Sequence, residues 1–394
     1  MKHRGVHLQY SFHPGGQQGA EVHNPLFDLL LAVREHGSIQ HAARHLGQSY
    51  RHVWGSLKQW QEVLGEPLVT WSQGQPARLT PFAERLLWAE QRARARLTPH
   101  IEALRAELER VLADALDGTH QVLTLFASHD MALPLLRERA LASQRLHIEL
   151  KFAGSLDALR ALAEGHCLVA GFHVPPLQGD ARVFARGLKP LLKPGRHKLI
   201  GCMRRMQGLM VAHGNPLKLR DLTDLSRRSL ADGRALRFIQ RQSGSGTRLL
   251  TDHLFAKLGI RLPEGDASAA LVEDSHVAVA AAIASGLADA GVGIEAAARA
   301  FGLGFVPLIE EDYFLVCLAD TLEHPAVQQL RQALAAPGFA LALHELPGYT
   351  AVRSGEILSL TRALPWWNFR QAKTDAMPRG ASSRRKTPEG HRHG

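Results

Sequence analysis

The stretch Arg241-Gln242-Ser243-Gly244-Ser245-Gly246-Thr247-Arg248 follows an apolar run at residues 236–239 and opens a helical pattern that begins at Leu249. At such a strand-to-helix junction, free backbone N–H groups and the positive end of the helix dipole face the same way. The two glycines let the backbone come close to a ligand, and the three hydroxyl side chains add donors without adding charge. The stretch therefore predicts a site for a small anion at the start of an α-helix. A plain serine-capped helix would have the same composition, so the octapeptide alone leaves both interpretations open.

The composition is that of a globular protein with a basic surface. Of the 394 residues, 45% are hydrophobic and 21% are charged, and a chain of this length has room for about two or three domains. The formal net charge of +10 favours an acidic partner such as nucleic acid, although a basic surface can also exist without one. Cys167, Cys202 and Cys317 lie far apart and the 22 histidines are scattered, so we expect neither a disulfide framework nor a metal site.

The apolar segments are too short or too polar for a membrane. Residues 1–19 lack an apolar core of signal-peptide length. The longest apolar stretch, residues 277–294, is interrupted by Ser285, Gly286 and Asp289. We therefore expect no membrane span and a cytoplasmic location.

Three short helical patterns follow one another in residues 24–64. The first runs up to Gly37, Ser38 is a suitable N-cap for the second, and Gly47 supplies the turn to the third. The third helix, residues 50–63 after the N-cap Ser49, is the candidate recognition helix. Its expected inward side is Val53, Leu57, Trp60 and Leu64. Two strand-like runs at residues 67–71 and 77–80 then predict a β-hairpin wing.

These elements predict a winged helix-turn-helix that binds double-stranded DNA, with a helical module that binds protein as the alternative. The residues expected to contact DNA are Ser38, Gln48, Ser49, Tyr50, Arg51, His52, Trp54, Lys58 and Arg78.

The motifs of this region also carry a family resemblance. They are Gly37-Ser38-Ile39, Ala42-Ala43, Leu46-Gly47, Ser49-Tyr50-Arg51 with Trp54, Gly65-Glu66-Pro67-Leu68-Val69 and Leu79-Thr80. Residues 24–97 thereby resemble the winged helix-turn-helix of the ModE-like molybdate-responsive regulators, a relative of the LysR-type domain. The wing departs from the pattern, because Thr70-Trp71-Ser72 replaces an arginine-bearing segment. The Mop-type molybdate domain is missing, so molybdate does not follow from this resemblance.

A long helical segment comes next. Pro81 begins a helix over residues 82–97, and Thr98-Pro99 is expected to end it and to cap a second amphipathic helix. The apolar face of that second helix carries Ile101, Leu104, Leu108 and Val111. Resemblance to LysR-type and ModE-like regulators implies a linker and dimerisation element, and hence a homodimer or tetramer. Packing against the chain's own second module is the alternative.

The remainder of the chain alternates strands and helices. Strands at residues 122–126, 147–152 and 168–172 alternate with helices at 131–141 and 156–162, which predicts a parallel sheet with ligands beyond the carboxyl ends of its strands. Strand-like runs at residues 199–202, 207–211, 305–308 and 313–317, together with further α/β units at 270–301, predict a second lobe. The chain crosses between the lobes more than once, as in a hinged clamp. Residues 291–296 also match the dinucleotide pattern G-x-G-x-x-A, but their late position favours a plain turn.

This half resembles the type 2 periplasmic-binding-protein fold. The resemblance is carried by Ser128-His129-Asp130, Gly154-Ser155, Ala170-Gly171-Phe172-His173, the octapeptide, His276, residues 288–293, residues 305–308 and Glu311-Asp312-Tyr313. It covers residues 122–346 and is closest to the cytoplasmic PBP-like domain that is fused to ModE-like helix-turn-helix units and to molybdopterin-biosynthesis proteins. The residues expected to contact the ligand are Ser128, His129, Ser155, His173, Arg241, Ser243, Gly244, Ser245, Gly246, Thr247, Arg248, His276 and Tyr313.

We therefore expect a multidomain chain. An all-α winged helix-turn-helix domain with a linker helix precedes an α/β bilobal domain of the periplasmic-binding-protein type. The expected boundaries are a disordered start at residues 1–23, the DNA-binding domain at 24–80, linker helices at 81–117, the ligand-binding domain at 118–369 and a disordered basic tail at 370–394.

The expected function is that of a one-component transcription regulator, with DNA and a small anionic effector as partners. Resemblance points to molybdate, tungstate or a molecule related to the molybdenum cofactor as the effector. No resident cofactor and no catalysis are expected, because no Ser-His-Asp set, metal cluster or poised carboxylate pair emerges from the spacing. The alternative is an enzyme or carrier of molybdenum-cofactor metabolism that uses the same cleft.

Overall fold

The computed structural model describes residues 24–71, 75–116, 121–175, 182–226, 234–261 and 271–367. The first module consists of α1 (Pro25–His36), α2 (Ile39–His45), α3 (Tyr50–Leu64) and a hairpin of β1 (Val69–Thr70) with β2 (Arg78–Leu79). The predicted caps are confirmed: Gly37 ends α1 at φ +58°, and the Ser38 and Ser49 side chains accept hydrogen bonds from the backbone N–H groups of His41 and His52. The predicted helix-turn-helix and its wing are therefore present.

One inward position of α3 was predicted wrongly. Val53 and Leu57 are buried, but Trp60 is 37% exposed. This module is small and buries only a narrow stripe of α3, and the large indole of Trp60 extends beyond it. The tip of the wing, residues 72–74, lies outside the described residues.

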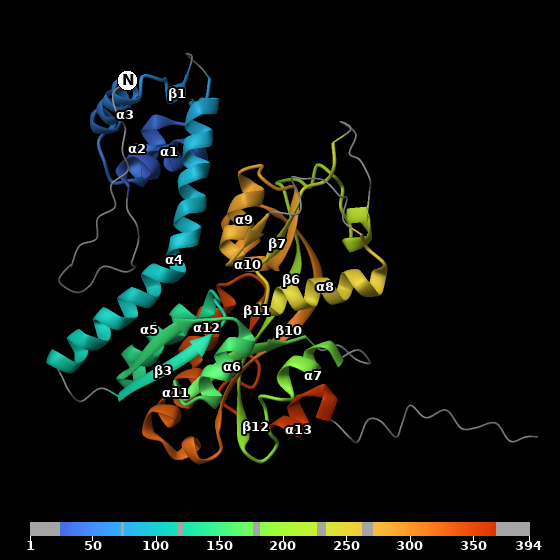
Figure 1. The fold of residues 1–394 in the computed structure, drawn as a ribbon. Helices are drawn as coiled ribbons and strands as arrows, with labels where there is room; N and C mark the ends of the chain where they lie inside the picture. The colour runs from blue at the N-terminus through green and yellow to red at the C-terminus, as the bar shows by residue number, and fades with distance from the viewer. Residues whose placement is uncertain are drawn as a thin grey trace, which may run out of the picture.

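The linker is one helix, α4 (Pro81–Leu116), instead of the two that Thr98-Pro99 was expected to separate. Proline removes a single backbone donor, and the Thr98 hydroxyl donates to the Arg94 carbonyl within the helix instead of capping a new one. The helix bends along its length (Figure 1), which is the usual response to an internal proline.

The second module is built on one ten-stranded sheet. Eight strands follow one another in the order β4 (Leu146–Phe152), β3 (Gln121–Ala127), β5 (Val169–Val174), β10 (Gly304–Leu318), β6 (His197–Val211), β9 (Ala290–Ile294), β7 (Phe238–Arg241) and β8 (Val272–Glu273). The other two, β11 (Tyr349–Thr350) and β12 (Ile357–Ser359), each pair with β6. The first lobe has the parallel strands β3 (Gln121–Ala127), β4 (Leu146–Phe152) and β5 (Val169–Val174), connected by α5 (Ala132–Gln144) and α6 (Ser155–Ala163). The β-α-β-α-β prediction is thus confirmed. His173, expected just beyond a strand, lies within β5, which is longer than the apolar run indicated.

Two long strands join the lobes. β6 (His197–Val211) and β10 (Gly304–Leu318) pair antiparallel along their length, where the sequence predicted two short strands for each. Gly201 and Gly208 lie within the long strand β6, where they allow close packing. A Cβ at Gly208 would collide with the Phe305 ring, and a Cβ at Gly201 would collide with the Arg353 backbone.

The second lobe contains β7 (Phe238–Arg241), β8 (Val272–Glu273) and β9 (Ala290–Ile294) with α8 (Gly246–Leu258), α9 (His276–Ala284) and α10 (Glu295–Ala300). The chain then returns to the first lobe through α11 (Pro325–Ala335) and α12 (Pro337–His344). The other elements are α7 (Arg182–Leu188), β11 (Tyr349–Thr350), β12 (Ile357–Ser359), α13 (Leu360–Ala363) and 3-10 helices at Leu222–Ser226, Asp320–Glu323 and Pro365–Trp367. Figure 1 shows β6 and β10 passing from one lobe to the other. The predicted bilobal fold is therefore confirmed.

The described part of the chain has no helix long and apolar enough to cross a membrane. The expected disordered start at residues 1–23 and the expected basic tail at residues 370–394 lie outside the described residues.

Candidate functional site

The octapeptide forms the loop between β7 and α8, as the sequence predicted. Gly244 has φ +83°, a conformation that glycine adopts readily. Ser245 is the N-cap of α8, and its Oγ accepts from the Arg248 backbone N–H at 3.2 Å and donates to the Gln242 carbonyl at 2.9 Å. The side chain of Ser245 is therefore used within the loop, and the free backbone N–H groups of the first turn of α8 remain as donors.

The first lobe faces this helix start across a pocket of about 420 Å³. Ser155, His173 and Gly246 line it, and so do the apolar side chains of Leu156, Phe184, Leu188 and Leu249. A Cβ built on Gly246 would lie 3.7 Å from Ser155 Oγ and 4.0 Å from His173 Cβ, so the lobes nearly touch here. Two loops also meet nearby, because a Cβ on Gly154 would lie 3.1 Å from the Gly244 carbonyl oxygen.

Several buried polar atoms of the described structure have no hydrogen-bond partner, and two of them, Ser155 Oγ and His173 Nε2, belong to residues that line this pocket. Both side chains are buried, at 5% and 4% exposure. His173 is held by Ser128, whose Oγ lies 3.0 Å from Nδ1, and Nε2 lies 3.7 Å from the Asp130 carboxylate. Buried polar atoms usually find a partner, so these two atoms and the start of α8 are the natural contacts of a polar ligand.

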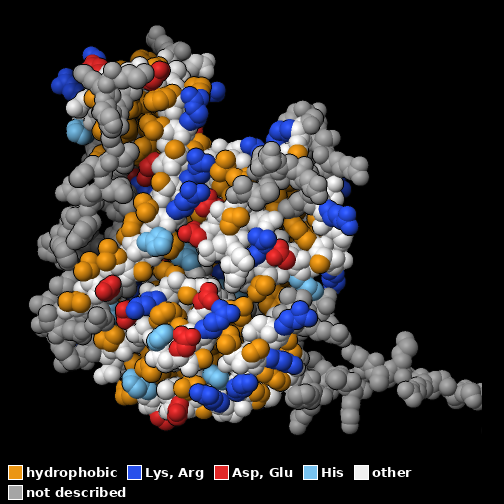
Figure 2. Space-filling view, viewed as in Figure 1, with side chains coloured by type: hydrophobic (Ala, Val, Ile, Leu, Met, Phe, Trp, Pro, Cys, Tyr) orange, Lys and Arg blue, Asp and Glu red, His pale blue; other side chains and the backbone are white. Residues whose placement is uncertain are grey.

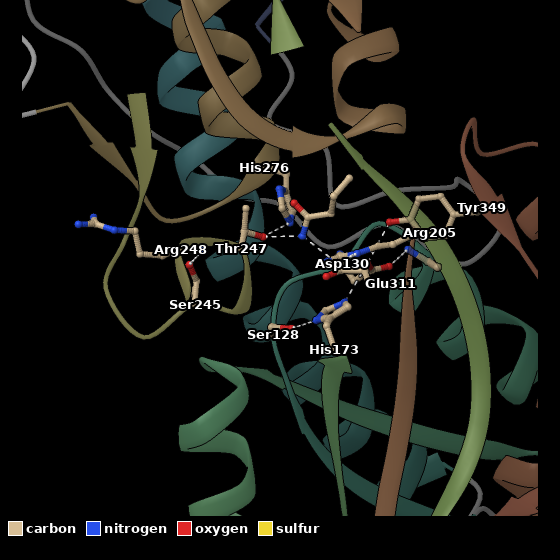
Figure 3. Close-up of polar contacts among 12 residues, drawn as sticks. Ser128, Asp130, His173, Arg205, Ser245, Thr247, Arg248, His276, Glu311 and Tyr349 are labelled. Atoms are coloured by element: carbon tan, nitrogen blue, oxygen red, sulfur yellow. Dashed lines mark hydrogen bonds and ion pairs between the residues drawn. The ribbon is translucent and has the colours of Figure 1, made fainter. Parts of the chain in front are cut away.

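A buried ionic network lies behind the pocket, where β6 and β10 cross between the lobes (Figure 3). The Arg205 guanidinium binds both Asp130 and Glu311, and its Nε lies 2.6 Å from Glu311 Oε1. Gln207 Nε2 donates to Glu311 at 2.8 Å and to Thr247 Oγ1 at 2.9 Å. Tyr349 donates to Asp130 at 2.9 Å. The network links the first lobe to the octapeptide.

The electrostatics of the network keep its acids charged and its histidines neutral. Burial alone would raise the pKa of Asp130 and Glu311, but the Arg205 guanidinium holds both below their ordinary values. Burial, together with the charge of Arg205, lowers the pKa of His173. Burial and the charges of Arg241 and Arg205 lower the pKa of His276, and lower that of His129 to about 4. The pocket therefore lies against a compensated ion cluster and neutral imidazoles.

The other predicted ligand residues are placed in different ways. Thr247 and His276 are buried together, 3.5 Å apart between Oγ1 and Nε2. Tyr313 is fully buried, with its ring against His173 at 4.3 Å between centroids. Arg241 is buried, and its Nη2 donates to the Asp274 carbonyl at 2.6 Å. The remaining three point elsewhere: Ser243 is exposed, His129 faces α4, and Arg248 binds Asp252 on its own helix.

In Figure 3 the Arg248 side chain points away from the buried network. The sequence reasoning missed Arg205, Gln207, Glu311 and Tyr349 as members of the site. A charged residue within the apolar run that became β6 was the available signal for Arg205.

The dinucleotide pattern at residues 291–296 has a packing explanation. A Cβ at Gly293 would collide with the Met210 side chain, and one at Gly291 would press on Ile239. These glycines allow β9 to pack closely against its neighbours.

The predicted DNA contacts lie on the surface of the first module. Gln48, Ser49, Tyr50, Arg51, His52, Trp54, Lys58 and Arg78 are exposed, and Ser38 is half-buried as the cap of α2. Trp54 on α3 meets Trp71 beside the wing edge-to-face, with ring centroids 6.3 Å apart. The recognition helix and the wing thus present one continuous surface. Their role in binding DNA stays a prediction.

Helix α4 contacts both lobes. Arg96 forms two hydrogen bonds with Glu273 of β8, at 2.9 and 2.5 Å. Six residues later, the Glu102 carbonyl accepts from Arg137 of α5 at 3.5 Å, and its carboxylate lies 3.8 Å from His129. Glu273 is paired in register with Arg241, next to the octapeptide. The helix that carries the DNA-binding module is therefore attached on either side of the cleft.

Comparisons with known proteins agree with this architecture. Residues 137–335 match the family model described as "PBP superfamily domain", and residues 26–84 match that of the "Bacterial regulatory helix-turn-helix protein, lysR family". The uncharacterized protein YvgK of Bacillus subtilis (strain 168) is 31% identical over 208 residues, which are 53% of this chain and 64% of YvgK. The match thus covers less than two thirds of that relative.

Solved structures of similar chains include CbnR, a LysR family transcriptional regulator, in complex with its target DNA (18% identity, TM-score 0.36, 78% of this chain and 98% of that one). Full-length BenM is 16% identical with a TM-score of 0.39, over 78% of this chain and 94% of that one. LysG of Corynebacterium glutamicum with its bound effector Arg is 20% identical with a TM-score of 0.35, over 79% and 96%. Similarity at this level does not identify a function.

The family model for the second module covers half of the chain, and it coincides with the bilobal sheet and the pocket. The chain therefore belongs to the PBP superfamily domain family and carries, ahead of that domain, a helix-turn-helix of the LysR type.

Proposed function

We propose that this protein is a LysR-type transcription regulator that binds double-stranded DNA through α3 and a small anionic effector in the pocket between its lobes. The observation that carries the proposal is the pair of buried atoms without partners, Ser155 Oγ and His173 Nε2, opposite the start of α8. Backbone N–H groups at a helix start favour an anion, and neutral hydroxyl and imidazole groups can complete its hydrogen bonds.

The pocket suggests which anions fit. Molybdate, tungstate and molecules related to the molybdenum cofactor are the first candidates, because the second module resembles the PBP-like domain that is fused to ModE-like helix-turn-helix units and to molybdopterin-biosynthesis proteins. A pocket of about 420 Å³ with Leu156, Phe184 and Leu249 in its wall favours an anion with an apolar body over a bare oxyanion.

Signal transmission would run through α4. Arg96 and Glu102 of α4 contact Glu273 of the second lobe and Arg137 of the first lobe. These two positions on α4 lie only about 9 Å apart along the helix. Movement of one lobe against the other changes the distance between their two partners. Closure of the cleft must therefore release one attachment or bend α4 at Pro99. Either change would move the DNA-binding module.

The assembly belongs to the same proposal. Leu104 and Val111 are exposed on the distal part of α4, at 48% and 52%, which suits pairing with the α4 of a second copy in a dimer or tetramer. The domain boundaries at residues 24–80, 81–117 and 118–369 and a cytoplasmic location are also proposed.

A thermal-shift series tests the effector. Wild type, Ser155→Ala and Arg248→Ala are heated with molybdate, tungstate, sulfate and a pterin cofactor in turn. A true effector raises the melting temperature of wild type and of Arg248→Ala, and raises that of Ser155→Ala less, because a ligand stabilises the state that it binds. Equal shifts in all three proteins would place the ligand outside this pocket.

Fluorescence anisotropy with labelled DNA tests the other half of the function. Arg51→Ala or Lys58→Ala should lower the slope of log affinity against log salt by about one, because each cation releases counterions from the phosphates. An unchanged slope in both variants would remove α3 from the interface.

A further inference from the structure

A second cavity lies between the DNA-binding module and the second lobe. Its volume is about 510 Å³. The walls come from three separate parts of the chain: α1, α4, and the α9 and α10 region of the second lobe. It is distinct from the cleft pocket and shares none of its lining residues.

The cavity contains a guanidinium whose charge is only partly compensated. Arg34 of α1 lines it, and the part of the chain that the structure describes offers Arg34 no hydrogen-bond or ion-pair partner. Its Cζ lies 4.3 Å from the centre of the Trp88 ring, a cation–π contact that fixes its orientation without neutralising it. Burial lowers the pKa of Arg34, and the nearby charges of Glu84 and Glu35 only partly oppose this effect.

The two other arginines of the cavity differ from Arg34. Arg94 is bound to Glu90 at 3.1 Å and to Asp28 at 3.4 Å, and Arg299 is bound to Glu295 at 2.9 Å. They add positive potential, although their own charges are compensated. Figure 2 shows further basic side chains along α4, a helix whose Lys and Arg residues are all arginines, and they add to the same potential.

Most of the remaining wall is suited to an apolar group, and Glu35 and Thr98 are further polar residues in it. Leu31, Ala95, Val277 and Phe301 line the cavity, and Ala95 packs directly on the second lobe. Gln91, also in the wall, has a buried Oε1 that lacks a partner. An occupant with a negative group for Arg34 and an apolar body for these walls would satisfy the most groups.

We propose that this cavity is a second ligand site, which binds a small organic anion between α1 of the DNA-binding module and α10 of the second lobe. A half-buried cation without a partner is destabilising unless something compensates it, and a carboxylate or phosphate ester is the chemistry that does so with two parallel hydrogen bonds. Because the occupant touches both modules, it would hold the DNA-binding module against the lobe. It would act on DNA binding independently of the cleft.

Phenylacetate is a suitable probe, with phenylacetamide as its neutral counterpart. Isothermal titration of the full chain should detect saturable binding of phenylacetate and much weaker binding of phenylacetamide. Arg34→Met should weaken phenylacetate binding at least about tenfold, since a charge-assisted hydrogen bond is lost. Ser155→Ala, which changes only the cleft pocket, should leave it unchanged.

Thermal unfolding without any ligand supplies a second test. Arg34→Met removes an only partly compensated charge and keeps the stem on Trp88, so its melting temperature should equal or exceed that of wild type. A lower melting temperature would mean that Arg34 has a structural role. That result, the absence of saturable phenylacetate binding to wild type, or equal affinity in Arg34→Met would each overturn the proposal. Sensitivity to Ser155→Ala alone would assign the probe to the cleft and also overturn it.

Discussion

The two walls of the cleft pocket use their polar groups differently. On the second lobe three side chains of the octapeptide are engaged within the protein: Ser245 caps α8, Thr247 accepts from Gln207, and Arg248 binds Asp252. On the first lobe Ser155 Oγ and His173 Nε2 are buried without a hydrogen bond, and Nε2 lies 3.7 Å from the Asp130 carboxylate. The glycine-rich loop therefore supplies backbone N–H groups and shape, while the free side-chain contacts for a ligand come from the opposite wall.

The largest effect is expected at the network that joins the walls. Arg205→Met leaves Asp130 and Glu311 buried without their cation, so the free energy of unfolding should fall by about 3–5 kcal/mol. Urea unfolding followed by circular dichroism measures this loss. Arg204→Met, at the more exposed neighbouring arginine that binds Asp312, is the matched control and should change stability by less than about 1 kcal/mol. Equal losses of stability in Arg205→Met and Arg204→Met would mean that the buried network stabilises the fold no more than the more exposed ion pair does.

Acid should act on His129, the histidine of the first lobe that faces α4. The folded-state pKa of His129 is about 4, below its unfolded value of 6.5, so its contribution to stability is present above pH 6.5 and is lost as the pH falls towards 4. The loss can reach about 3 kcal/mol at the lower end. Between pH 7 and 4, urea unfolding should show a smaller fall in the free energy of unfolding for His129→Gln than for wild type. Parallel curves would show that His129 does not titrate in this way.

Glu102 on α4 should have the opposite dependence. Burial raises its pKa to about 7, so its contribution to stability is present at low pH and is lost as the pH rises through 7. Glu102→Gln keeps the backbone contact to Arg137 and should be more stable than wild type at pH 8, with no gain at pH 5. Thermal unfolding of Glu102→Gln and wild type at pH 8 and pH 5 measures this gain in stability. The same difference in melting temperature at both pH values would contradict the buried position of the carboxyl.

The smallest effects concern the octapeptide and distinguish the walls most clearly. Ser245→Ala removes an N-cap and should lower the free energy of unfolding by about 1 kcal/mol, with little effect on ligand binding. Arg248→Ala breaks a partly exposed pair within α8 and should change stability by less than about 0.5 kcal/mol. Ser155→Ala should barely alter stability but weaken ligand binding. Denaturant midpoints and effector thermal shifts are measured on the same three variants. Equal stability losses and equal thermal shifts in Ser155→Ala and Ser245→Ala would refute the claim that the two walls differ.

Local sequence signals predicted the local structure well. The caps Gly37, Ser38 and Ser49 and the strand-to-helix loop at residues 241–248 were confirmed, because their physics involves near neighbours in the chain. Two predictions were wrong: Thr98-Pro99 does not end the helix, and β6 is one long strand instead of two short ones. In both places, packing against the lobes or against β10 outweighs the local sequence signal that would end a helix or strand. Contacts between distant segments, such as Arg205 with Glu311, depend on a strand register that no single sequence reveals.

Mass spectrometry of the small molecules released from purified protein tests the central claim most directly. Three samples are compared at equal concentration: wild type, the double variant Ser155→Ala with His173→Ala, and Arg248→Ala. We predict that wild type and Arg248→Ala release the same small anion and that the double variant, folded by circular dichroism, has lost it. Retention of that anion by the double variant, or its loss from Arg248→Ala alone, would contradict the assignment of the ligand contacts to the first wall.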